Sequence, residues 1–354
     1  MALVNEGVNM DLSLRFRGCI IGGAIGDALG YPVEFQTFEQ IKSDYGDSGI
    51  TDLMKDPVTR MARISDDTQM TLFTANGLQL WRGIQTMRDA GVLSGRMPNV
   101  VESICKAYQR WYYTQSGHIR SESLLAPAIG EDSHDFILDQ QELFHRRAPG
   151  NTCLSALQAG MGTLERPLNH SKGCGGVMRV APIGLFYYND PARAFDIGCK
   201  AAAITHGHVT GYLASGAFSM IIACLVQGKT LTEALTNSMD ELVKHSGYEE
   251  TTSALDLAQR LAASPASTME AIAQLGEGWI AEEALAIAVY CALVGTSFED
   301  ALIRSVNHDG DSDSTGAICG NIVGCMLGVD AIPIEWLKHV ELVNFMNRLA
   351  LDLM

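Results

Sequence analysis

The sequence predicts an all-α fold, and two patterns support this prediction. Apolar residues recur mostly at intervals of three and four, as in DTQMTLFTANGLQLW (67–81) and AEEALAIAVYCALVG (281–295). This period places them on one face of a helix. Alternation of apolar and polar residues, which is typical of a half-buried strand, is hard to find over any useful length. We therefore expect a compact fold of many helices.

The expected helices follow one another along the whole chain. The clearest of them cover residues 18–30, 67–81, 192–206, 215–227, 281–295 and 316–328. No proline-rich or low-complexity linker separates them. Two acidic clusters near opposite ends of the chain would both be needed for one site. We therefore predict a single domain over residues 13–354, preceded by an N-terminal extension, 1–12, that is either a tail or a partner-binding segment.

Composition excludes several classes of protein. The chain has 354 residues, 47% of them hydrophobic, which suffices for a large core. A formal net charge of −16 and the lack of any basic run exclude a general nucleic-acid binder. The nine cysteines are scattered without a C-x-x-C pair, which predicts reduced core residues and no disulfide or zinc site. Since no signal pattern opens the chain and the longest apolar stretches fall short of the roughly 18 residues that span a bilayer, we expect a cytoplasmic protein with no membrane partner.

Two of the expected helices carry glycine at every fourth position. The glycines fall at 18, 22, 26 and 30 in the first helix and at 316, 320, 324 and 328 in the last. A glycine inside a helix costs about 1 kcal/mol relative to alanine, so a stripe of four indicates close backbone packing. Two interpretations have equal weight. Either the two helices lie against each other or a shared neighbour, which would bring the chain ends together, or each packs on a different neighbour.

Acidic residues and hydroxyls cluster at the starts of two helices. SDDT (65–68) opens one of them and DGDSDST (309–315) opens the other. One acid per helix start is explained by N-capping and the helix dipole, but five carboxylates in two places need a cation or a proton to relieve their repulsion. Carboxylate and hydroxyl oxygens suit Mg²⁺ or Mn²⁺. Glu34, four residues beyond the first glycine helix, would reach the same site, although alone it would be an ordinary exposed loop acid.

Six motifs, taken in order, make the sequence resemble the ADP-ribosylglycohydrolase family, which includes the dinitrogenase reductase-activating glycohydrolases and the ADP-ribosylarginine hydrolases. They are GCIIGGAIGDALGYPVEF, ISDDTQMTLFTANGL, GCGGVMRVAPIGL, ITHGH, LGEGWIAEEALAIAVY and NHDGDSDSTGAICGNIVG, and they span residues 18 to about 328. The resemblance implies a compact all-α fold with a dinuclear Mg²⁺ or Mn²⁺ centre in a cleft. It also implies cleavage of a glycosidic bond at C1″ of ADP-ribose.

The resemblance assigns roles to individual residues. The implied metal ligands are Ser65, Asp66, Asp67, Asp311, Asp313 and Ser314, with the two serines at positions where threonine is common. Glu34 would contact a metal, its water or the ribose. Asp309 stands where glycine is usual, and whether it supports the ligands, alters metal choice or alters access stays open.

The same resemblance implies a substrate site on the loop KGCGGVMR (172–179). Its substrate-binding residues would be Gly173, Gly175, Gly176 and Met178, with His206 nearby. Backbone N–H groups of such a loop can approach a diphosphate without obstruction from side chains. Taken alone, the glycines would be an ordinary turn and His206 a structural histidine.

The predicted reaction is metal-dependent hydrolysis that removes ADP-ribose from modified protein side chains, most of all arginine. Asp67 and Glu34 are the candidates for the catalytic base, while Asp66, Asp311 and Asp313 would mainly hold the two metal ions. The partner would be an ADP-ribosylated protein. The alternative function is an immunity protein that binds an ADP-ribosyltransferase toxin and occludes its active site, with residues 1–12 as the plug.

Overall fold

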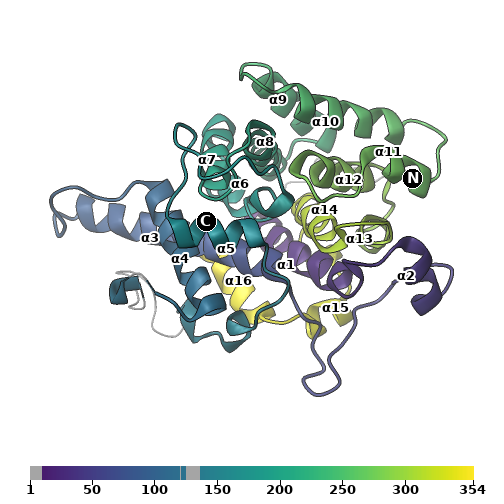
Figure 1. The fold of residues 1–354 in the computed structure, drawn as a ribbon, viewed down its shortest axis with the longest axis horizontal. Coiled ribbons are helices and arrows are strands. Elements are labelled where there is room, and N and C mark those ends of the chain that lie inside the picture. Colours follow the sequence, from purple (N-terminus) through teal and green to yellow (C-terminus); the bar gives the residue numbers. More distant parts are fainter. Residues whose placement is uncertain (1–9, 120, 125–135) are drawn as a thin grey trace.

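Sixteen α-helices and several short 3₁₀ turns account for the regular structure of the described residues, which are 10–119, 121–124 and 136–354 of a computed structural model (Figure 1). In chain order the helices are α1 (Leu12–Gly30), α2 (Phe38–Tyr45), α3 (Asp66–Asp89), α4 (Val100–Ser116), α5 (Asn151–Ala159), α6 (Ala181–Phe186), α7 (Pro191–Ala203), α8 (Val209–Val226), α9 (Leu231–Leu242), α10 (Glu249–Ala262), α11 (Thr268–Leu275), α12 (Ala281–Val294), α13 (Phe298–Val306), α14 (Ser312–Leu327), α15 (Ile334–His339) and α16 (Val343–Asp352).

Within these described ranges the β-structure is limited to three isolated bridges: Lys55 with Ala62, Ala62 with Val340, and Gly173 with Ile280. The prediction of an all-α fold is therefore confirmed. Residues 1–9, most of the predicted N-terminal extension, lie outside the described residues, and the single domain over 13–354 stays a prediction.

Local sequence signals set where many of the helices begin. Four helices open with a reciprocal capping box, in which the N-cap side chain accepts from the third helical amide and the side chain at that third position accepts from the N-cap amide. The N-cap residues are Thr37 for α2, Asn99 for α4, Thr230 for α9 and Ser267 for α11. Each box satisfies amides that would otherwise lack a partner at a helix start.

The two glycine stripes face each other across the contact between α1 and α14. A Cβ atom on Gly18 would lie 2.2 Å from the carbonyl oxygen of Gly324. The corresponding distances are 2.4 Å from Gly22 to Gly320 and 1.9 Å from Gly26 to Gly316. The helices are antiparallel, because the residue number in α14 falls by four each time the residue number in α1 rises by four. The first of the two interpretations of the stripes is therefore correct.

This register brings the end of α1 to the start of α14. The last glycine of α1, Gly30, packs on the carbonyl of Ser312 in the first turn of α14, with 2.2 Å between a Cβ position and that oxygen. Pro32 lies in the short 3₁₀ turn Tyr31–Val33 that ends the α1 direction, and Glu34 follows it. Because of this helix contact, Glu34 lies close to the acidic N-terminus of α14.

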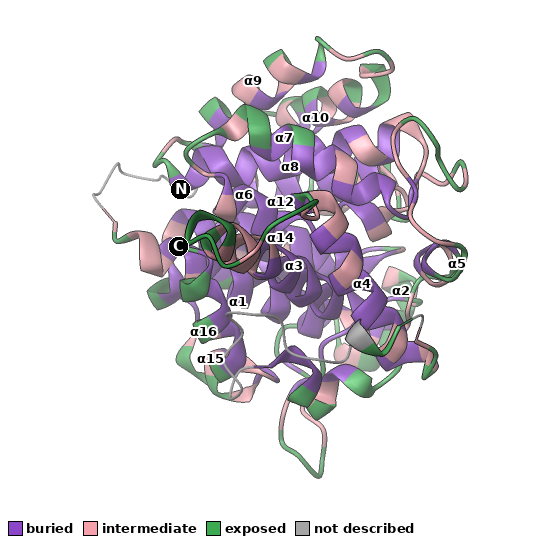
Figure 2. Ribbon diagram, turned by 90° about the vertical axis from the view of Figure 1, so that its left-hand side faces the viewer, coloured by how far each residue is buried: buried purple, intermediate pink, exposed green. Residues whose placement is uncertain are grey.

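The core of the molecule lies around α1, α8, α12, α14 and the first half of α3, whose residues are mostly buried (Figure 2). Helix α8 is long and apolar enough to cross a membrane by length and composition, yet 89% of it is buried inside the protein. This burial is typical of a core helix. All nine cysteines are free, and eight of them are buried, as the sequence predicted.

Replacing Gly22 or Gly320 by alanine should destabilise the fold by about 1–3 kcal/mol, even though alanine is the better helix former, because the added methyl meets backbone that cannot move aside. Urea unfolding followed by circular dichroism measures the change. Gly150→Ala is the matched control, since a Cβ there meets only the sulfur of Cys153 at 3.9 Å. If both core variants were as stable as wild type, the glycine contact would not hold the two helices together.

Candidate metal centre

The predicted metal ligands lie at the N-termini of two helices, α3 and α14. Ser65 is the N-cap of α3, and its Oγ accepts a hydrogen bond from the amide of Asp67 at 3.2 Å. Asp311 is the N-cap of α14, and its Oδ1 accepts from the amide of Ser314 at 3.2 Å. The capping interpretation therefore holds at both sites. Because capping uses only part of the acidic cluster, it leaves the remaining carboxylates to be explained.

Glu34, Asp311 and Asp313 bring their carboxylates close together. One oxygen from each lies within 4.8 Å of one from each of the others, and all three residues are buried. Burial, and then the charges of Asp313 and Asp311, raise the pKa of Glu34 to about 10. Burial and the neighbouring Asp311 likewise raise the pKa of Asp313 well above its usual range.

The two acids of α3 belong to the same electrostatic cluster. Asp66 and Asp67 are 5% and 3% exposed. Burial, followed by the charge of Asp313, raises the pKa of each carboxyl well above its usual value. The structure therefore brings together the predicted acidic ligands from residues 66–67 and 311–313, almost 250 positions apart in the sequence.

Two carboxylate oxygens in this cluster are buried without a hydrogen-bond partner: Oε2 of Glu34 and Oδ1 of Asp67. An unpaired buried carboxylate oxygen is costly, and a divalent cation would satisfy it. The donor set contains only carboxylates and the hydroxyls of Ser65 and Ser314, which hard cations such as Mg²⁺ prefer. These residues therefore fit a metal ion.

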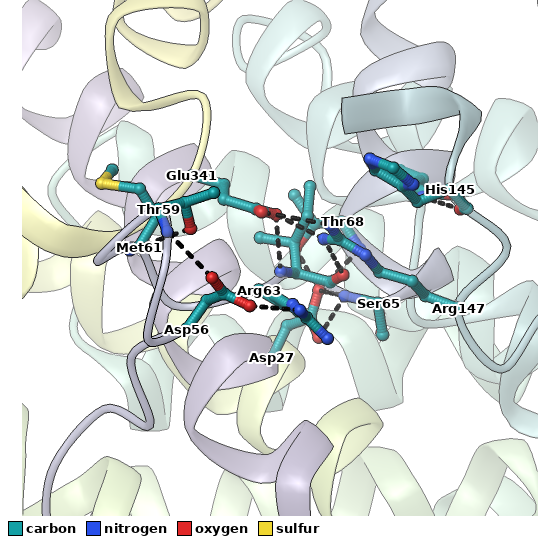
Figure 3. A network of polar contacts seen from close by, with 12 residues as sticks. Asp27, Asp56, Thr59, Met61, Arg63, Ser65, Thr68, His145, Arg147 and Glu341 are labelled. Atoms are coloured by element: carbon teal, nitrogen blue, oxygen red, sulfur yellow. Dashed lines mark hydrogen bonds and ion pairs between the residues drawn. The ribbon is translucent and has the colours of Figure 1, made fainter. Parts of the chain in front are cut away.

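Asp27 is a central residue of the site that the sequence analysis did not identify. It lies inside α1 and is fully buried. Both of its carboxylate oxygens accept from the amide of Ser65 at 3.0 Å, and Oδ2 accepts from the amide of Thr68 at 3.1 Å and from its hydroxyl (Figure 3). Burial, and then the charge of Asp313, raise its pKa to about 7. Asp27 thus holds the start of α3 against α1.

The loop before α5 fixes Asp66 from the other side. The amide of Asp66 donates to the carbonyl of Arg147 at 3.2 Å, and the amide of Gly150 donates to Oδ2 of Asp66 at 3.2 Å. Arg147 forms a buried ion pair with Glu341 and also donates to the carbonyl of Ile64 at 2.9 Å (Figure 3). A residue near the C-terminus therefore supports the start of α3, an arrangement that no sequence motif indicated.

The glycine-rich loop lies over His206 and reaches the carboxylates. A Cβ on Gly175 would lie 3.0 Å from Cε1 of His206, and one on Gly173 would lie 3.5 Å from its Nε2. The thiol of Cys174, between these glycines, donates to Oδ2 of Asp311 at 2.7 Å. Cys174 is the one half-buried cysteine. The sequence analysis treated all the cysteines as core residues and did not predict this contact.

The remaining predicted residues of this loop lie deeper in the protein. Gly176 is buried, and a Cβ there would lie 3.2 Å from that of Ala202. Met178 is 3% exposed and belongs to the hydrophobic core, while its carbonyl accepts from the hydroxyl of Thr71 at 3.4 Å. Its side chain therefore supports the loop from below, and a direct contact of Met178 with substrate stays a prediction.

A cavity of about 480 Å³ adjoins the glycine-rich loop. It lies among α4, α5 and the segment before the loop, and its lining includes Arg146, Asn151, Thr152, Asn169 and Ser171. Ser171 connects the cavity to the loop, because its hydroxyl oxygen accepts from the amide of Gly173 at 3.3 Å. The volume is within the usual range of small-molecule sites.

The sequence is similar to those of several known proteins. The ADP-ribosyl-dinitrogen reductase glycohydrolase of Rhodospirillum rubrum is 25% identical over 93% of this chain and 90% of its own. The ADP-ribosylarginine hydrolase Tri1 of Pseudomonas putida is 21% identical over 96% of this chain and 77% of its own. ADP-ribosylhydrolase ARH3 of Homo sapiens is 26% identical over 48% of this chain and 54% of its own.

A solved structure and a family model extend the similarity to nearly the whole chain. The structure, titled an ADP-ribosylglycohydrolase-related protein complex, covers 97% of both chains with a TM-score of 0.60 at 23% identity, and it shows the shared fold. The family model described as ADP-ribosylglycohydrolase matches residues 9–354. The protein therefore belongs to the ADP-ribosylglycohydrolase family.

Proposed function

We propose that this protein is a metal-dependent hydrolase that removes ADP-ribose from modified protein side chains, with arginine as the linkage. The observation that carries the proposal is the buried carboxylate cluster, with its two unpartnered oxygens, beside a glycine-rich loop and a cavity of about 480 Å³. The Rhodospirillum and Pseudomonas hydrolases named above, which match over most of this chain, support the class of reaction.

The cluster would hold two Mg²⁺ or Mn²⁺ ions. The residues for this role are Ser65, Asp66, Asp67, Asp311, Asp313 and Ser314, joined by Glu34. When bound, such ions lower the pKa of a coordinated water and polarise oxygens of the substrate. Asp27 accepts hydrogen bonds from the amides of Ser65 and Thr68, and these bonds would keep the start of α3 in place for this role.

Asp67 and Glu34 are the residues that would accept the proton of the attacking water. Each has a buried carboxylate oxygen that no hydrogen bond uses, Oδ1 in Asp67 and Oε2 in Glu34. Asp66 and Asp311 each accept a hydrogen bond from an amide, at 3.2 Å from Gly150 and from Ser314. These bonds favour the charged form, so we assign Asp66 and Asp311 to metal holding and the proton transfer to the other two.

The glycine-rich loop and the cavity beside it would bind the ADP-ribose. Gly173 and Gly175 are half-buried, and neither adds a side chain that would keep a diphosphate away from the backbone of the loop. The guanidinium of Arg146 lines the cavity and would attract the same negative charge. The hydrogen bond from Cys174 to Asp311 joins the loop to the carboxylates, which supports a substrate site next to them.

His206 would take part as a neutral imidazole. Burial, and then the positive charge of Arg179, lower its pKa to about 3. Its Nδ1 lies 2.8 Å from the hydroxyl oxygen of Thr205, and its other edge faces the glycines of the loop. A neutral ring supports the loop without adding a charge that would vary around neutral pH.

Arginine is the proposed linkage because the Pseudomonas relative, whose name specifies arginine, matches 96% of this chain. The human ARH3 relative, whose name gives no linkage, matches 48%. The immunity-protein alternative depends on residues 1–12. Since residues 1–9 lie outside the described part of the chain and no observation on the rest favours toxin binding, that alternative stays a hypothesis.

Asp311→Asn should abolish metal-dependent release of ADP-ribose and weaken Mg²⁺ binding by roughly 100-fold, because asparagine still caps α14 but lacks the charge. Release from an arginine-ADP-ribosylated protein, with Mg²⁺, with Mn²⁺ and with a chelator, measures the first effect, and calorimetry the second. Asp330→Asn, at an exposed position beyond the other end of α14, is the matched control for loss of a negative charge. Full turnover and affinity in Asp311→Asn would show that the metal assignment is wrong.

The wild-type protein should release ADP-ribose faster from ADP-ribosyl-arginine than from ADP-ribosyl-serine. The two substrates should be compared at equal concentration on peptides that differ only in the modified residue, with free ADP-ribose quantified over time. Equal or faster release from serine would contradict the arginine proposal while leaving the hydrolase proposal intact.

Stability should fall on acidification partly because of His206, since its folded pKa of about 3 lies below the ordinary value of 6.5. The unfolded chain then binds a proton that the folded protein excludes, so this contribution is complete above pH 6.5 and is lost progressively toward pH 3. Between pH 7 and pH 5, the free energy of unfolding should therefore fall by about 1–2 kcal/mol less in His206→Gln than in wild type, as measured by urea unfolding. Other groups are common to both proteins, so equal losses would contradict the buried neutral ring.

A further inference from the structure

The segment that carries Glu34 makes two contacts with the loops on the other side of the carboxylate cluster. The amide of Phe38 donates to Oδ1 of Asp309 at 2.6 Å. The ring of Phe35 stacks on that of Trp279, with 5.8 Å between ring centroids and an angle of 16° between the planes. Phe35 and Phe38 flank the same short turn, so this segment is held at two points.

Asp309 lies on a loop that is itself firmly fixed. The imidazole of His308 lies 3.0 Å from the carbonyl oxygen of Ser305 and 2.9 Å from the hydroxyl of Thr315. The amide of Asp311 donates to the carbonyl of Glu277 at 2.8 Å, and a Cβ on Gly310 would lie 2.0 Å from that same oxygen. The carboxylate of Asp309 is therefore an acceptor at a defined position.

The contact between Phe38 and Asp309 also completes the start of α2. The side chain of Thr37, the N-cap, accepts from the amide of Gln40, and the side chain of Gln40 accepts from the amide of Thr37. The amide of Phe38, the first helical residue, has no partner inside the helix. Asp309 supplies that partner, and a negative charge at a helix N-terminus is favourable.

The position of Glu34 depends on its segment more than on its own side chain. Its Oε2 is buried without a hydrogen-bond partner, and no described ion pair holds the carboxylate. Phe38 lies four positions after Glu34, and Asp309 lies two positions before Asp311. The hydrogen bond thus joins the two segments whose carboxylates meet within 4.8 Å.

We propose that Asp309 is a positioning residue that holds the Glu34 segment against the loop of Asp311 and thereby sets the affinity of the carboxylate cluster for a divalent cation. This inference rests on the proposed function only in that the cluster binds a metal. Groups outside the set of metal ligands commonly change metal affinity by roughly 10–100-fold through the ligands they orient. Asp309 would act in this way through Glu34.

The test is calorimetric titration of the metal-free full chain with Mg²⁺ and with Mn²⁺. Asp309→Ala removes the acceptor and should weaken binding by roughly tenfold. Asp309→Asn keeps an oxygen for the amide of Phe38 but removes the charge, and it should bind nearly as tightly as wild type. Equal weakening in both variants would mean that the charge of Asp309 matters and its hydrogen bond does not, which would overturn the proposal.

Two further variants distinguish a positioning role of Asp309 from a general loosening of α2. Thr37→Ala removes the capping box of α2 but leaves the hydrogen bond between Phe38 and Asp309, so it should lower stability without changing metal affinity. In a double-mutant cycle, Asp309→Ala should have little further effect once Glu34→Gln is present, because Asp309 acts through Glu34. Full additivity in that cycle, or weakening by Thr37→Ala equal to that by Asp309→Ala, would overturn the proposal.

The outcomes also separate this inference from the proposed function. If wild type binds neither metal, the cluster is not a metal site, and both ideas fail together. If wild type binds metal and Asp309→Ala binds it equally well, only the positioning role fails, and the hydrolase proposal stands unchanged.

Discussion

The close antiparallel contact between α1 and α14 is the constraint on which the rest of the structure depends. Glycines at every fourth position let the two backbones meet without side chains between them, and the partner positions run in strict register from Gly18 with Gly324 to Gly30 with Ser312. A shift of one turn would move the start of α14 by about 5.4 Å relative to the end of α1. The register therefore decides whether Glu34 meets Asp311 and Asp313, and the helix packing and the candidate site have the same origin.

The electrostatics of the site oppose folding and are balanced by the surrounding backbone. Burial and mutual repulsion raise the pKa values of Asp66, Asp67 and Asp313 well above their ordinary range. The N-termini of α3 and α14 direct amides and the positive end of the helix dipole at these groups, which offsets part of that cost. Asp27 shows the same balance, because its buried carboxylate accepts from the amides of Ser65 and Thr68. A bound cation would relieve the repulsion that remains among these carboxylates in the metal-free protein.

Much of this arrangement could be predicted from the sequence. The parts that could not be predicted were missed for physical reasons. Helical periodicity gave the all-α fold, because it is a local property of each segment. The glycine stripes indicated close approach but not the partner, since spacing along one helix says nothing about which backbone packs on it. Asp27 escaped notice because a single acid inside a helix has no local signature, and its role appears only when α3 is placed beside it. Asp309 could not be assigned for the same reason, as its partner amide belongs to a helix start 271 positions away.

The contact between the first and last long helices also bears on the order in which the protein can fold. Asn321 donates to the carbonyl of Cys19 across 302 positions of sequence, within the same pair of helices that frames the site. Contacts of such long separation are expensive in chain entropy and form slowly. During synthesis, α1 would have no partner until α14, residues 312–327, had been made. The carboxylates of α3 would be synthesised long before those of α14, so the nascent chain would lack the complete cluster, and metal capture would be a late event that follows folding of the whole chain.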